Sequence, residues 1–74
     1  MEREHRGWKI RTTARPVDGA WSAMIEVWQP GQRPHTHSAV ILPFTDSFDT
    51  AQSAEEVAVS AAERWINHQE RRSP

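Results

Sequence analysis

The feature that most constrains the fold of this chain is the dipeptide Asp18-Gly19, which separates two runs of alternating side chains. The first run extends from about Trp8 to Arg15 and the second from about Trp21 to Gln29, and a period of two is typical of β-strands. Asp-Gly favours a two-residue hairpin turn because both residues tolerate a positive φ. We therefore predict an antiparallel hairpin with this turn at its tip.

The turn also predicts how the two strands pair. On one face, the predicted pairs are Ala14 with Ala23, Thr12 with Ile25 and Ile10 with Val27. On the opposite face, Arg11 lies across from Glu26 as an ion pair, and Lys9 lies across from Trp28 as a cation–π contact. A shift of one residue would remove the match on both faces, so the chemistry of the pairs supports this register.

A third apolar run is expected to form the next strand, from about Thr36 to Phe44, after a loop that holds two prolines and a glycine. Its centre, Ala39-Val40-Ile41-Leu42, is apolar at successive positions, which is typical of a strand buried on both sides. The pattern leaves the register of this strand open. Either Val40 and Leu42, or Ala39 and Ile41, face the same side as Trp28.

An alanine-rich helix is expected to begin after Thr50 or Ser53, since either residue can cap it. One stripe of this helix carries small residues and a tryptophan: Ala51, Ala54, Ala58, Ala61, Ala62 and Trp65. We predict an α+β fold, a three-stranded antiparallel meander with one C-terminal α-helix packed on one face (β-β-β-α). Residues 1–74 are expected to form a single domain, with an ordered core of about 7–68 and frayed termini.

Composition limits the class of protein. The 74 residues leave room for one small core, and domains of this size are often stabilised further by self-association. Cysteine is absent, which excludes disulfides and thiolate metal sites. A net charge of −1 argues against a general polyanion binder. The charged first residues lead into no long apolar segment, so we expect a soluble, cytoplasmic protein that does not meet a membrane.

One helix can cover only one face of such a sheet, and the other face is expected to meet a partner. A mixture of cations and apolar side chains lines it, and an exposed apolar strip usually marks an interaction site. We therefore predict a small non-enzymatic protein-interaction module that self-associates as a homodimer or binds a protein partner. The predicted contact residues are Met24, Trp28, Val40, Leu42, Lys9 and Arg11.

The alternative class is a nucleic-acid-binding domain. In this interpretation Lys9, Arg11 and Arg15 contact phosphates while Trp28 stacks on a base. The carboxylate of Glu26 in the middle of the same face, together with the net negative charge, argues against it. The simpler interpretation is that these cations keep an exposed sheet soluble.

Catalytic and metal-binding motifs are weak. His35-Thr36-His37 places two imidazoles on one side of a strand, as in some metal sites, but no carboxylate follows at close spacing. Neither a glycine-framed nucleophile nor a phosphate-binding loop is present in the sequence. We expect no enzymatic activity, no bound metal and no cofactor.

The segments with the clearest pattern also carry a resemblance. Asp18-Gly19-Ala20-Trp21-Ser22-Ala23, an apolar strand, and Phe48-Asp49-Thr50 before an alanine-rich helix that ends in Trp65-Ile66-Asn67 follow in order. Over residues 7–68 this order resembles uncharacterised small bacterial β-β-β-α proteins and is loosely similar to the HicB-type antitoxin domain. The resemblance implies a protein-binding module without catalysis, in the antitoxin case one that masks a toxin.

Overall fold

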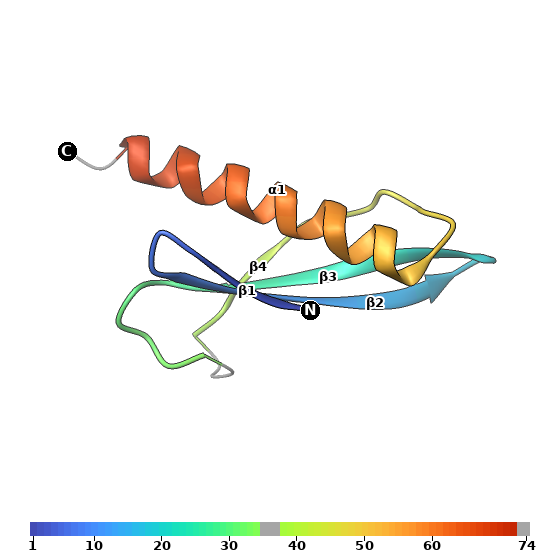
Figure 1. The fold of residues 1–74 in the computed structure, drawn as a ribbon, viewed down its shortest axis with the longest axis horizontal. Coiled ribbons are helices and arrows are strands. Elements are labelled where there is room, and N and C mark those ends of the chain that lie inside the picture. Colours follow the sequence, from blue (N-terminus) through green and yellow to red (C-terminus); the bar gives the residue numbers. More distant parts are fainter. Residues whose placement is uncertain (35–37, 73–74) are drawn as a thin grey trace.

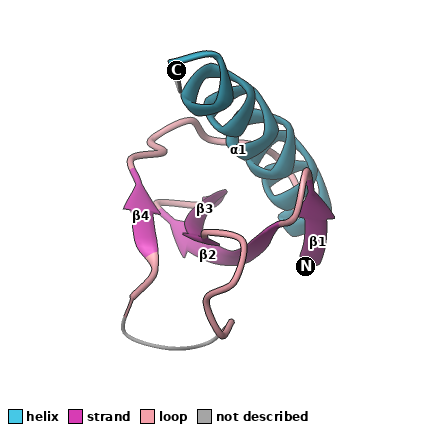
Figure 2. Cartoon of the chain, turned by 90° about the vertical axis from the view of Figure 1, so that its left-hand side faces the viewer, coloured by secondary structure: helices cyan, strands magenta, loops and turns pink. Residues whose placement is uncertain are grey.

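The computed structural model describes residues 1–34 and 38–72, and these form an antiparallel sheet with one helix across it (Figure 1). The elements are β1 (Glu2–His5), β2 (Trp8–Val17), β3 (Ala20–Trp28), β4 (Val40–Leu42) and α1 (Ala51–Arg72). Strand order in the sheet follows chain order, and α1 lies on one side of it (Figure 2). The α+β class with a C-terminal helix on one face is confirmed, but the described part of the sheet has four strands rather than three.

The central hairpin has the predicted turn and register. Asp18 and Gly19 have φ values of 47° and 79°, as a tight hairpin turn requires. The observed pairs include Ala14 with Ala23, Thr12 with Ile25, Ile10 with Val27, Arg11 with Glu26 and Lys9 with Trp28. The predicted register is confirmed at each of these positions, because the turn sets which residues oppose each other. The predicted cation–π contact differs: Arg11 rather than Lys9 lies over Trp28, and Lys9 contacts Glu4.

The additional strand is β1, which pairs with β2 through a second two-residue turn. Arg6 and Gly7 have φ values of 53° and 83°, so this turn resembles the one at Asp18-Gly19. The first residues, expected to be frayed, are therefore part of the sheet, and α1 continues to Arg72 rather than ending near residue 68. The sequence did not predict this turn, because residues with long side chains, such as Arg6, seldom adopt a positive φ.

The core lies between α1 and the sheet face that it covers. Thr50 caps the helix: its side-chain oxygen accepts a hydrogen bond from the Ser53 N–H at 3.1 Å. The small side chains of the helix stripe let its axis approach the sheet closely, and Trp65 packs edge-on against Trp8 with ring centroids 5.6 Å apart. The buried cluster consists of Trp8, Ile10, Ala23, Ile25, Val27, Leu42, Ala54, Ala58, Ala62 and Ile66.

Polar contacts hold one side of α1 to β1 and β2. The Trp8 Nε1–H donates to the Glu70 carboxylate at 2.8 Å, and His5 Nε2 lies 2.8 Å from Asn67 Oδ1. Near the start of the helix, the Thr12 hydroxyl donates to Glu55 at 3.4 Å. The helix packs mainly over β2 and β3, and the edge strand β4 lies to one side of it (Figure 2).

Candidate interaction surface

The sheet face away from α1 is called the open face here, and the strand pairing assigns its side chains. Directly paired residues project to the same side of a sheet, and alternate residues of a strand share a face. Starting from the core residue Ile25, this alternation gives the open face one set of residues from each strand. They are Glu2, Glu4, Lys9, Arg11, Thr13, Arg15, Val17, Ala20, Ser22, Met24, Glu26, Trp28 and Ile41.

Ion pairs occupy one end of the open face. Arg11 Nη2 lies 2.7 Å from Glu26 Oε1, and the Lys9 ammonium contacts the Glu4 carboxylate. With Glu2 and Arg15, this face has three carboxylates and three cations, so its formal charge is zero. The cations that the sequence suggested for phosphate contacts are therefore balanced by carboxylates on the same surface.

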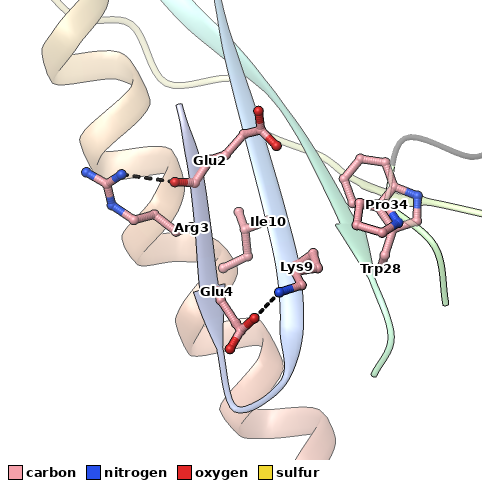
Figure 3. Close-up of a pocket in the computed structure, with 7 residues that line it drawn as sticks. All are labelled: Glu2, Arg3, Glu4, Lys9, Ile10, Trp28 and Pro34. Atoms are coloured by element: carbon pink, nitrogen blue, oxygen red, sulfur yellow. Dashed lines mark hydrogen bonds and ion pairs between the residues drawn. The ribbon is translucent and has the colours of Figure 1, made fainter. Parts of the chain in front are cut away.

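Trp28 lies on the open face but is not available as a platform. Its side chain is 1% exposed, and the Arg11 guanidinium lies over the indole with Cζ 5.7 Å from the ring centroid. Residues 29–34 bend to the side of the sheet away from α1, and Pro34 lines the same pocket as Trp28 (Figures 1 and 3). The predicted contact residue Trp28 therefore lies on the expected face but is buried, because alternation predicts a face and not whether a loop covers it.

A pocket of about 390 Å³ lies where β1, β2 and the end of β3 meet this loop (Figure 3). Its lining residues are Glu2, Arg3, Glu4, Lys9, Ile10, Trp28 and Pro34. None of these seven residues is a serine, threonine, cysteine or histidine, and the lysine is engaged by a carboxylate. The described lining therefore has no side-chain hydroxyl, thiol or imidazole, and its charged groups include the Lys9–Glu4 ion pair.

The register of β4 decides between the two alternatives left by the sequence. Leu42 pairs with Ile25 and Val40 with Val27, so both project to the side of α1, and Leu42 is 8% exposed within the core. Ile41 pairs with Glu26 and projects from the open face. Val40 and Leu42, predicted as contact residues, therefore do not lie on the open face, and Ile41, from the other register, lies there instead.

Three exposed apolar side chains, Met24, Val40 and Ile41, lie on or beside β4, and we call them the edge patch. Val17 is also exposed but lies apart from them, next to the turn between β2 and β3. Ile41 is 57% exposed, Met24 38% and Val40 37%. Met24 and Ile41 are diagonal neighbours on the open face, since Ile41 opposes Glu26 two residues further along β3. Val40 lies on the opposite face of β4, beyond the helix. The edge patch therefore wraps around an edge strand that is apolar on both sides.

Other candidate chemistry is limited. His35 and His37, the possible metal ligands, lie outside the described residues. Within residues 1–34 and 38–72, no three histidine or acidic side chains are grouped as a metal ion would require. The same residues contain no helix with the length and apolar character needed to cross a bilayer.

Comparison of the chain with known protein families, with curated proteins and with solved structures gave no match.

Proposed function

We propose that this chain is a small non-enzymatic interaction module, which binds a protein surface through the edge patch of Met24, Val40 and Ile41. The observation that carries the proposal is the exposure of Ile41 and Val40 on both faces of one edge strand. Apolar residues gathered on a sheet edge lower the free energy when another protein covers them, and edge strands are common sites of strand addition.

The remainder of the open face supports a protein partner more than a nucleic acid. Lys9 and Arg11, which would contact phosphates, are paired with Glu4 and Glu26. Trp28, which would stack on a base, is covered. The motifs that resemble the HicB-type antitoxin domain favour the same class of protein-binding module.

Matched charge substitutions test the proposal. Ile41→Lys places an ammonium group in the edge patch, whereas Val17→Lys places one at an exposed apolar position of the same open face outside the patch. The readouts are sedimentation of the purified chain and quantitative capture of proteins from native lysate. We expect Ile41→Lys to abolish an association, with itself or with a captured protein, that Val17→Lys retains. Equal behaviour of both variants, or no association of the wild-type chain in either assay, contradicts the proposal.

A further inference from the structure

The two edges of the sheet differ in how they are protected against further pairing. At one edge, β1 consists of Glu2-Arg3-Glu4-His5, and charged side chains discourage the addition of another strand. At the other edge, β4 consists of Val40-Ile41-Leu42, and no charged residue lies between Ser38 and Thr45. The apolar character of β4 on both faces is typical of an interior strand, yet in the single chain it forms an edge.

Successive residues of a strand direct their backbone hydrogen bonds alternately to the two neighbouring strands, and this alternation identifies which backbone groups of β4 point outward. The two-residue turn makes Val17 and Ala20 a hydrogen-bonded pair, so even-numbered residues of β3 bond to β2 and odd-numbered ones bond to the other neighbour. The Trp21 N–H is consistent with this alternation, because it donates to the Phe48 carbonyl at 2.8 Å, on the side away from β2. Ile25 and Val27 therefore bond to Leu42 and Val40, and the N–H and C=O of Ile41 point away from the sheet.

This arrangement is self-complementary. An antiparallel strand that places its own Ile41 opposite Ile41 of the first copy exchanges two N–H···O=C bonds across a two-fold axis. Val40 of each copy then lies opposite Leu42 of the other, on the side of α1, and the two Ile41 side chains lie together on the open face. Because β4 contains no charged residue, the pairing brings no like charges together. Pro43 has no N–H and opposes Ala39, so the ladder ends there.

We propose that the occupant of the edge patch is a second copy of this chain, joined by antiparallel pairing of the two β4 strands about a two-fold axis at Ile41. This inference rests on the proposed function and names its partner. The pairing extends the sheet from four described strands to eight and covers Val40 and Ile41. Because β4 is short, the dimer is weak and its population rises with protein concentration.

Single cysteines distinguish this dimer from one formed face to face, since the natural chain has no cysteine. Directly opposed hydrogen-bonded residues have Cα atoms about 5.5 Å apart, within the range that a disulfide spans. Ile41→Cys is therefore expected to cross-link rapidly under mild oxidation. Met24→Cys is the matched control, because the two β3 strands are separated by three strand spacings, roughly 14 Å. Far-ultraviolet circular dichroism of both variants checks that each is folded.

The expected result combines two measurements. The wild-type chain sediments with twice its mass of 8.5 kDa at high concentration and dissociates on dilution, and only Ile41→Cys cross-links efficiently. Rapid cross-linking of Met24→Cys without cross-linking of Ile41→Cys overturns the strand pairing in favour of packed open faces. A wild-type chain that stays monomeric at all concentrations also overturns it. In that case, loss of a captured protein by Ile41→Lys alone leaves the proposed function standing with a different partner.

Discussion

The Arg11 guanidinium lies over the indole of Trp28, 5.7 Å from the ring centroid, on the sheet face that α1 leaves open. The same guanidinium is held by Glu26. Trp28 is thus buried on the far side of the sheet from α1, and we expect its role to be structural. Because Trp28 is covered, we assign the candidate interaction surface to the β4 edge rather than to the Trp28 end of the open face.

Replacing Trp28 tests this structural role. Trp28→Ala is expected to lower the free energy of unfolding by about 3 to 5 kcal/mol, as for other fully buried aromatic side chains. Met24→Ala, an exposed change on the same strand, should alter it by less than about 0.5 kcal/mol. Urea denaturation followed by circular dichroism measures both. Equal stability of the two variants contradicts the burial of Trp28. Should Trp28→Ala fail to fold, Trp28→Phe is expected to lose less stability than Trp28→Ala but still more than Met24→Ala.

The turn that forms β1 can be probed at Gly7. Gly7 and Gly19 both have positive φ values, so alanine at either position costs about 1 to 2 kcal/mol in backbone strain. A Cβ atom at Gly7 would also lie 3.3 Å from Cγ of Pro30, whereas nothing lies within 4 Å at Gly19. Gly7→Ala should therefore destabilise the fold more than Gly19→Ala. Thermal unfolding of the two variants side by side checks the order, and the reverse order contradicts the packing of Pro30 on the turn.

The hydrogen bond from Trp8 to Glu70 joins the last turns of α1 to β2. Glu70→Ala leaves the buried indole N–H without its acceptor and is expected to cost about 1 to 2 kcal/mol of folding stability. Glu70→Gln keeps a carbonyl oxygen at this position and serves as the control, with a smaller loss. Chemical denaturation of both variants measures the difference. Indistinguishable stabilities would show that the bond contributes nothing measurable.

Nucleic-acid binding is tested by fluorescence polarisation with a labelled single-stranded oligonucleotide at low salt. We expect no saturable binding, because the open face is electrically neutral and its tryptophan is covered. Binding that weakens steeply as salt rises, and that is lost in Arg15→Glu, would instead support the alternative class.

The central hairpin could be predicted from the sequence because its determinants are local. Asp18-Gly19 favours a two-residue hairpin turn, and that turn sets every pair from Val17 and Ala20 to Lys9 and Trp28. No comparable turn connects β3 to β4, so the face on which Val40, Ile41 and Leu42 lie depends on tertiary packing, and the sequence leaves it open. The structure resolves it through the burial of Leu42 beside Ile25.

Two features of the candidate site were missed for different reasons. The strand β1 carries a readable signal, since Glu2 and Glu4 match Arg11 and Lys9 across a glycine-containing turn. The burial of Trp28 has no comparable signal. It depends on where the loop after β3 lies in space, and period-two alternation contains no information about that.

The most direct test of the β4 pairing is amide hydrogen exchange of the isotopically labelled wild-type chain at several concentrations. The two-fold pairing predicts that the Ile41 amide exchanges slowly in concentrated solution and faster on dilution. The Leu42 amide, which bonds within the single chain to β3, is the internal control and should stay protected throughout. An Ile41 amide that exchanges at the same rapid rate at every concentration would contradict the proposed dimer.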